Sequence, residues 1–289
     1  MILSQRSIPL DIIILRKGNK MTEIAKGIDV SQWQGRFDWA RAASEGIKFA
    51  VIKGGGGDGG LYTDSHFAEN YNGAKKAGIS VGAYFYSGAL TTAAAVAEAD
   101  MFCDKILAGK KFDLPVYIDV EDPDMLALGK RQLTDIVKAF CARCEQRGYF
   151  VGIYSSLSYF SSMLIDSELK RYSHWVAEWG DRCTYPDESC LGMWQNSSSG
   201  TVAGVRCDTD ILYVDFPKLI KDKSLNGYKD DGTGKVDGDV NGDGVLSSKD
   251  LVRLMKDIAS GDTNPSEDIN GDGVVNSKDL VALMKKEAE

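Results

Sequence analysis

Between residues 26 and 215, short apolar runs alternate with longer amphipathic stretches. The runs are GIDVSQW, KFAVIKG, SVGAYFYS, PVYIDVED, FVGIYSS, HWVAEW, GMWQNSS and CDTDILYV. Helical patterns that end in Gly fill the earlier gaps, as in SHFAENYNGAKKAG and RQLTDIVKAFCARCEQRG. Repeated strand–helix units with eight strand candidates predict an α/β fold, a (β/α)8-like barrel around a parallel sheet. Because the gaps between the last three runs are too short for helices, we expect an irregular final third.

The C-terminal part follows a different pattern, which is a tandem repeat. DVNGDGVLSSKDLVRLMK and DINGDGVVNSKDLVALMK are nearly the same sequence and start 29 residues apart. Each copy places side-chain oxygens at positions 1, 3, 5, 9 and 12 of a loop, Gly at position 6, and a carbonyl at position 7, which suits calcium. The predicted ligands of two calcium ions are Asp239, Asn241, Asp243, Val245, Ser247 and Asp250, then Asp268, Asn270, Asp272, Val274, Asn276 and Asp279.

These patterns divide the chain into four segments. We expect a poorly ordered N-terminal extension over 1–25, the barrel over 26–221, a polar linker over 222–238, and a small all-α calcium-binding module over 239–289. The early run IPLDIIIL has no small-residue cleavage site after it, so it is a poor secretory signal. No apolar run reaches the roughly 20 residues of a membrane helix. The net charge of −8, without a cluster of Lys or Arg, argues against nucleic acid as a partner.

Two carboxylic acids stand out at the end of one predicted strand, PVYIDVED. Asp119 and Glu121 are two residues apart, so both side chains face the same side of the strand. Placing like charges together raises the pKa of one of them, and a protonated carboxyl group is what general-acid cleavage of a glycosidic bond requires. The alternative is that the pair solvates a strand end or binds a lysine. Asp29 and Asp210 lie in runs that we expect to be neighbours where the barrel closes.

Aromatic side chains lie on the same runs as the acids. Rings of this kind stack on sugar faces, although we expect about half of them to pack in the core. Neither of the two histidines is spaced for zinc, and a structural role is expected for His174. The aromatic candidates are Tyr84, Tyr86, Tyr154, Trp175, Trp179 and Trp194.

Six cysteines permit disulfides without requiring them in a domain of this size. Cys183 and Cys190 flank one loop and Cys207 is nearby in sequence, so a bridge can form in this region. Cys141 and Cys144 are one helical turn apart, where each would more naturally reach a third residue such as Cys103 than the other. No pairing can be assigned from the sequence, and redox catalysis is not expected.

The order of the motifs over about residues 26 to 216 resembles glycoside hydrolase family 25, the lysozymes that act as N-acetylmuramidases. The resemblance rests on GIDVSQWQG, FAVIKG, GAKKAGISVGAYFYS, LPVYIDVED, VGIYSS, HWVAEW, MWQNSSSGTVAGV and CDTD. It implies an irregular β/α barrel that cleaves the β-1,4 bond between N-acetylmuramic acid and N-acetylglucosamine in peptidoglycan, without a cofactor. By this resemblance Glu121 is the proton donor, Asp119 is its partner acid, and Asp29 and Asp210 complete the catalytic set. The nucleophile can be the substrate's acetamido oxygen, an Asp or water.

Two departures from the family pattern affect the expected substrate contacts. The segment after the second strand is KGGGGDGG, where Lys53 is retained and the acidic residue is displaced to Asp58 or lost, and we expect a flexible cleft loop there. Asn196 replaces an aromatic residue after Gln195. Chitinase-like enzymes also use an acid pair, but would have Asp in place of Tyr117 and Leu114. The predicted substrate-binding residues are Lys53, Tyr84, Tyr86, Tyr154, Trp179 and Gln195.

The tandem repeat resembles a type I dockerin, a module that binds enzymes to cohesin domains of a cell-surface scaffold. Turn-forming residues precede each loop, so only the exiting helix of each calcium-binding motif is expected. The resemblance implies a cohesin partner, an extracellular or cell-surface setting, as in a cellulosome, and a monomeric enzyme. Two alternatives are a catalytically silent peptidoglycan-binding barrel on a scaffold, and a repeat that serves as a calcium-stabilised cap on the barrel. The predicted cohesin-binding residues are Ser248, Lys249, Ser277 and Lys278.

Overall fold

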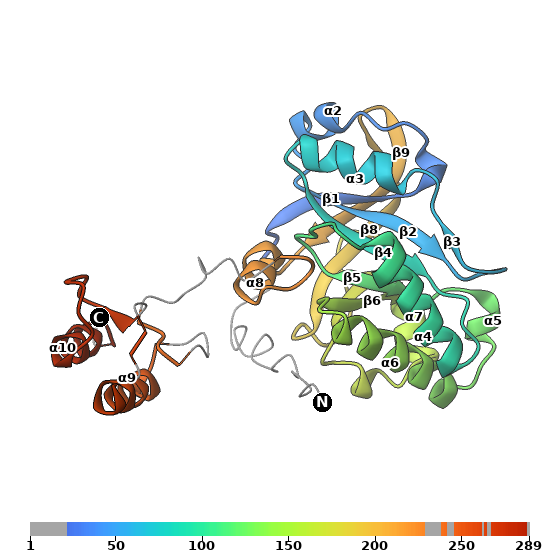
Figure 1. The fold of residues 1–289 in the computed structure, drawn as a ribbon. Helices are drawn as coiled ribbons and strands as arrows, with labels where there is room; N and C mark the ends of the chain where they lie inside the picture. The colour runs from blue at the N-terminus through green and yellow to red at the C-terminus, as the bar shows by residue number, and fades with distance from the viewer. Residues whose placement is uncertain (1–21, 229–237, 242–245, 262, 265–266, 288–289) are drawn as a thin grey trace. The chain divides into compact units, whose positions relative to one another are not determined.

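The computed structural model describes residues 22–228, 238–241, 246–261, 263–264 and 267–287 (Figure 1). The chain forms two units, Met1–Lys229 and Asp230–Glu289. The first 21 residues of the predicted N-terminal extension lie outside the described ranges. No helix within those ranges is both long and apolar enough to cross a membrane.

Eight strands of the first unit form a closed barrel. The sheet order is β1-β9-β8-β7-β6-β5-β4-β2, and a parallel pairing of β1 with β2 closes it. A short strand, β3 (Tyr62–Thr63), adds to β2. Each of the eight apolar runs contains one barrel strand, which confirms the predicted α/β barrel. The strands are β1 (Ala25–Val30), β2 (Phe49–Gly56), β4 (Ser80–Tyr86), β5 (Val116–Asp119), β6 (Val151–Ser156), β7 (Ser173–Ala177), β8 (Leu191–Val202) and β9 (Val205–Leu212).

The final third of the barrel is irregular, as expected, and the last strand reverses direction. β8 and β9 form a hairpin, and β9 is antiparallel to both β8 and β1, whereas the other neighbouring barrel strands are parallel. The expectation of an entirely parallel sheet is therefore wrong for β9. As a consequence, the beginning of β9 lies at the same edge of the barrel as the carboxyl ends of the other strands.

Helices cover the outer face of the barrel (Figure 1). The predicted helices are present as α3 and α6, and each is followed by a Gly with positive φ, Gly78 at 74° and Gly148 at 83°. Alternate strand residues such as Ile28 and Ile52 pack beneath the helices, while Tyr117 and Trp175 fill the interior. The helical elements are η1 (Gln32–Gln34), α2 (Trp39–Ser44), α3 (Phe67–Lys76), α4 (Thr92–Met101), η2 (Phe102–Ile106), α5 (Pro123–Leu126), α6 (Lys130–Gln146), α7 (Leu157–Ser162), η3 (Asp166–Glu168) and α8 (Phe216–Asp222).

The glycine run at the end of β2 is part of the sheet. A Cβ atom at Gly55 would lie 2.0 Å from the backbone oxygen of Tyr62, and one at Gly57 would lie 1.9 Å from Oε1 of Glu98. The glycines thus allow β3 and α4 to approach this strand closely. The expectation of a flexible cleft loop is wrong for Gly54–Gly56, which lie in β2.

Residues after α8 pack against the amino-terminal end of the barrel. The side chain of Asn226 is completely buried; its Oδ1 accepts from Phe150 N at 2.6 Å, and its Nδ2 donates to Leu114 O at 2.7 Å. Tyr228 donates from its hydroxyl to Asp113 at 2.5 Å. These residues fall within the segment predicted as a linker, and we propose that the barrel domain extends to Tyr228.

The second unit contains α9 (Ser248–Ser260) and α10 (Ser277–Glu287), which contact each other. Each helix follows one of the repeated loops, and Leu254 and Leu283 are completely buried. These helices confirm an all-α module at the C-terminal end.

Candidate active site

The acid pair lies at the mouth of the barrel, where the parallel strands end. Asp119 is the last residue of β5, and Glu121 follows two residues later. Asp119 is 3% exposed, and its Oδ1 has no hydrogen-bond partner among the described residues. Glu121 is exposed at the mouth. The structure therefore brings together one buried and one accessible carboxyl group.

The surroundings of these two carboxyl groups favour their protonated forms. Burial and then the neighbouring Glu121 raise the pKa of Asp119 well above its usual value, with Lys53 acting in the opposite direction. The pKa of Glu121 is also raised, because the walls of the mouth partly desolvate it; Lys53 opposes this shift and Asp208 adds to it. A carboxyl group that is accessible and has a raised pKa can deliver a proton to a bound substrate.

Lys53 lies on the interior face of β2 and is surrounded by tyrosine rings. Its Nζ is 4.7 Å from the ring centroid of Tyr86 and 5.9 Å from those of Tyr62 and Tyr84. The charge of Lys53 also acts to lower the pKa of both Asp119 and Glu121, so the cation offsets part of the charge of the acid pair.

On the opposite wall of the mouth, Gln195 of β8 links four side chains through hydrogen bonds. Its Nε2 donates to Asp29 Oδ2 at 2.8 Å and to Asp208 Oδ2 at 3.2 Å. Its Oε1 accepts from the Tyr154 hydroxyl and from Trp179 Nε1, both at 3.1 Å. An amide group can make four hydrogen bonds, so this side chain is fully engaged with protein partners.

Asp208 was not among the residues predicted from the sequence. In the register between β1 and β9, Asp208 pairs with Asp29 and Asp210 pairs with Gly27. Asp208 is therefore nearer the mouth, whereas Asp210 is 1% exposed and accepts from Trp175 Nε1 at 2.8 Å. The sequence did contain a signal for Asp208, because the spacing in CDTD puts Asp208 and Asp210 on one face of the strand.

The two buried acids of this wall also have raised pKa values. Burial and then Asp208 raise the pKa of Asp29 from 3.8 to about 8. Burial and then Asp29 raise the pKa of Asp210 well above its usual value. Burial beside other carboxyl groups thus favours the protonated forms of Asp29 and Asp210 as well.

The aromatic candidates divide between the core and the rim. Trp175 packs edge-on against Tyr84 and Tyr117 and lies 4.3 Å from the Tyr154 ring centroid, so it belongs to the floor of the site. Trp194 is 7% exposed and donates to the Glu178 carbonyl. At the rim, Trp179 is 64% exposed and Trp33, which was not predicted, is 81% exposed directly after β1.

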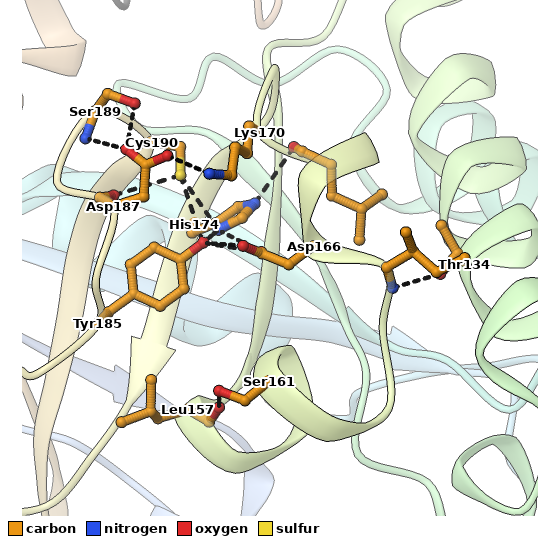
Figure 2. Close-up of polar contacts among 12 residues, drawn as sticks. Thr134, Leu157, Ser161, Asp166, Lys170, His174, Tyr185, Asp187, Ser189 and Cys190 are labelled. Atoms are coloured by element: carbon orange, nitrogen blue, oxygen red, sulfur yellow. Dashed lines mark hydrogen bonds and ion pairs between the residues drawn. The ribbon is translucent and has the colours of Figure 1, made fainter.

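A second polar cluster surrounds His174, outside the barrel interior (Figure 2). His174 is completely buried, contacts the Tyr185 hydroxyl through Nδ1 at 2.9 Å, and has its pKa lowered to about 4 by burial. Cys190 lies 3.6 Å from both groups, and burial raises its pKa to about 12. A neutral imidazole beside a protonated thiol is a structural arrangement, as expected for His174. All six cysteines are free thiols in the structure, including Cys183 and Cys190.

The second repeated loop is described throughout. Asp268 accepts from the amides of Gly271, Asp272 and Gly273 at 2.7–3.1 Å, and Asp279 accepts from Ile269, Asn270 and Asn276 at 2.8–3.1 Å. In the first loop, Asp250 accepts from Asn241 and Ser247 in the same way, while Asp243 and Val245 lie outside the described residues.

The calcium assignment of these loops rests on the chemistry of their donors. Within the described ranges, no three His, Cys, Asp or Glu side chains are arranged to hold a metal ion. The loop carboxylates instead accept hydrogen bonds from loop amides. The donor set of the second loop nevertheless consists only of oxygen atoms, which fits calcium.

Comparisons with known proteins agree with both parts of the structure. Residues 28–205 match the model of glycosyl hydrolases family 25, and residues 237–286 match the type I dockerin domain. The autolytic lysozyme of Clostridium acetobutylicum is 30% identical over 80% of this chain, which spans 66% of that protein. Lysozyme M1 of Streptomyces globisporus is 32% identical over 65% of this chain and 67% of its own length.

Among solved structures, the lysozyme from Streptomyces coelicolor aligns with a TM-score of 0.60 and 29% identity. The alignment covers 71% of this chain and 98% of that one. The match of the family model to more than half of the chain, together with the barrel and its mouth, decides the assignment. The chain is a glycoside hydrolase that belongs to family 25 and carries a C-terminal type I dockerin domain.

Proposed function

We propose that the barrel is a peptidoglycan muramidase, which cleaves the β-1,4 bond between N-acetylmuramic acid and N-acetylglucosamine as a monomer. The observation that carries the proposal is the pairing of the accessible Glu121 with the buried Asp119 at the barrel mouth. The relatives named as lysozymes support the same substrate class.

In the proposed reaction, Glu121 protonates the leaving glycosidic oxygen, because partial desolvation raises the pKa of its carboxyl group and so favours the protonated form. Asp119 orients the substrate's 2-acetamido group or stabilises positive charge at the anomeric carbon. Asp29 and Asp210 remain the other two acids of the sequence-based proposal, and Asp208 joins them because it lies nearer the mouth. No cofactor takes part in this scheme.

Sugar contacts are proposed for the residues that line or surround the mouth. Gln195 acts mainly by holding Asp29 and Asp208, since its amide is fully engaged, and the Tyr154 hydroxyl in turn donates to Gln195. Trp33 is added at the rim because its ring is exposed. The full set is Lys53, Tyr84, Tyr86, Tyr154, Trp179, Gln195 and Trp33.

We further propose that the dockerin binds two calcium ions and docks the enzyme to a cohesin on an extracellular or cell-surface scaffold. Ser248, Lys249, Ser277 and Lys278 are exposed at the starts of α9 and α10. Apolar side chains at equivalent positions of the two copies are also more than half exposed. These are Val252 and Met255 in α9, and Val281 and Met284 in α10.

Replacement of Glu121 with Gln tests the proposed reaction. Gln keeps the shape but cannot donate the proton, so we expect clearing of purified cell walls to slow by about 100-fold or more. Asp122→Asn is the matched control, because Asp122 caps α5 through Oδ1 and Asn can do the same. If wild type clears walls no faster than Glu121→Gln, the barrel is a catalytically silent binding domain.

A further inference from the structure

Two thiols on different helical elements lie in contact behind the barrel. Cys103 belongs to η2 and Cys144 to α6; they are 2% and 0% exposed, and their sulfur atoms are 3.6 Å apart. A separation of 3.6 Å is a contact between reduced sulfurs, which must approach to about 2.05 Å to form a disulfide. We propose that Cys103 and Cys144 are a site of oxidative modification and form a disulfide in the mature enzyme.

Contacts on both sides of the thiol pair hold α6 against α4 and η2, which follow each other directly along the chain. Arg143 binds Asp100 through two hydrogen bonds of 2.7 and 3.0 Å, and Arg147 binds Asp104 at 2.7 Å. The rings of Phe102 and Phe140 also pack at 6.2 Å between centroids. Because ion pairs and rings fix the backbones, the two sulfur atoms stay opposite each other.

The third cysteine of this region, Cys141, shares part of its surroundings with Cys144. Cys141 is completely buried, and its charged neighbours are Glu145 and Arg171. Glu145 and Arg171 form an ion pair with N–O distances of 2.9 and 3.0 Å. Because the sulfur of Cys103 contacts that of Cys144, the structure selects Cys144 over Cys141 as the partner of Cys103, a choice that spacing along the helix left open.

The bond forms by thiol–disulfide exchange with a small-molecule disulfide or a disulfide oxidoreductase. One thiolate attacks the donor disulfide and releases a thiol, and the second thiolate then displaces the remaining donor sulfur. Two S–H bonds are lost and one S–S bond forms, while two electrons and two protons convert the donor disulfide to two thiols. Because both sulfurs are buried in the folded barrel, this exchange takes place as the chain folds.

The disulfide would join η2 to α6, and η2 packs against β2, the strand that carries Lys53. A Cβ atom at Gly54 would lie 2.7 Å from the Phe102 ring, and one at Gly55 would lie 3.0 Å from Ile106 Cδ1, so η2 backs this part of β2 directly. The bond closes a loop between positions 41 residues apart, which restricts the unfolded chain.

Peptide mapping of the full-length protein tests the proposal. The protein is folded in a buffer of reduced and oxidised glutathione, denatured, alkylated and digested without reduction. We expect the peptides of Cys103 and Cys144 to be joined and the other four cysteines to be alkylated. Alkylation of all six cysteines, or a link that contains Cys141, would overturn the proposal.

Thermal unfolding gives a second readout. Reduction should lower the melting temperature of wild type by on the order of 10 °C. Cys141→Ser should keep both the link and this shift, and Cys103→Ser should lose both. If Cys103→Ser does not fold, the wild-type peptide map still decides. An equal melting temperature with and without reductant, in protein that maps as linked, would refute the supporting role.

Discussion

Carboxyl groups at the barrel mouth differ in what surrounds each one. Glu121 is exposed and faces Lys53, Asp119 is buried beside it, and Asp29 and Asp208 share the amide of Gln195. In contrast, Asp210 is bound to an indole at the floor of the site. We therefore expect the proposed roles of these groups to follow from depth and hydrogen-bond partner, because residue type is nearly the same throughout.

Asp208 and Asp210 can be distinguished by conservative replacement. We expect Asp208→Asn to lower the turnover of wall lysis by about 100-fold, because its carboxyl group is nearer the mouth. Asp210→Asn should lower it by much less, because the residue is buried beneath the site. The initial rate of wall clearing, with thermal unfolding as the control for folding, measures both. An equal loss for Asp210→Asn at unchanged stability would restore the sequence-based prediction.

The raised pKa of Asp29 predicts a loss of stability as pH rises. Between pH 3.8 and about 8, Asp29 is protonated in the folded chain and ionised in the unfolded chain. Its contribution is thus complete below pH 3.8 and declines by up to about 1.4 kcal/mol per pH unit as pH rises toward 8.

Denaturant unfolding at several pH values measures this decline. We expect Asp29→Asn to have a shallower dependence of the unfolding free energy on pH than wild type, because Asn does not titrate. Identical slopes for the two proteins would show that Asp29 does not hold its proton in the folded state.

At the scale of elements, two strands depart from the regular barrel and both departures affect the site. The reversal of β9 moves Asp208 toward the mouth. The glycine-rich end of β2 lets β3 and α4 close on the strand that carries Lys53. The apolar runs identified both strands, but direction and close approach depend on pairing with distant parts of the chain.

Adding a methyl group at Gly55 tests the close approach of β3 to β2. Gly55→Ala should lower the free energy of unfolding by about 1–3 kcal/mol, because the added Cβ would lie 2.0 Å from the Tyr62 carbonyl oxygen. Gly129→Ala is the matched control, since a Cβ there meets no atom within 4 Å, and its cost should stay within about 1 kcal/mol. Equal stabilities of the two variants in denaturant would contradict the packing argument.

At the scale of the whole molecule, the barrel and the dockerin domain are separate units. Residues up to Tyr228 belong to the packing of the barrel, so a deletion that tests the docking module must begin after this residue. Truncation of the chain at the predicted linker boundary would remove Asn226 and leave the buried Phe150 amide without its hydrogen-bond partner. We expect this loss to lower the free energy of unfolding by about 1–3 kcal/mol.

Removal of calcium should separate the two activities. We expect EDTA to abolish binding to a cohesin, because loop carboxylates without a cation repel one another. Wall lysis in suspension should change little, both in EDTA and after deletion of Asp230–Glu289. Cohesin capture and wall clearing, measured on one preparation, check this. A large loss of barrel stability on deletion would instead favour the calcium-stabilised cap.

Local patterns in the sequence determined the strand runs, the pair Asp119 and Glu121, and the two repeated loops with their oxygen donors. Each of these depends on spacings of a few residues, which the chain displays directly. Only the tertiary structure decided the direction of β9, the position of Asp208 and the contact of Cys103 with Cys144. It also decided the role of Gln195, which binds Asp29 from 166 residues away. Pairings over such distances are selected by barrel closure and packing, so no local spacing reveals them.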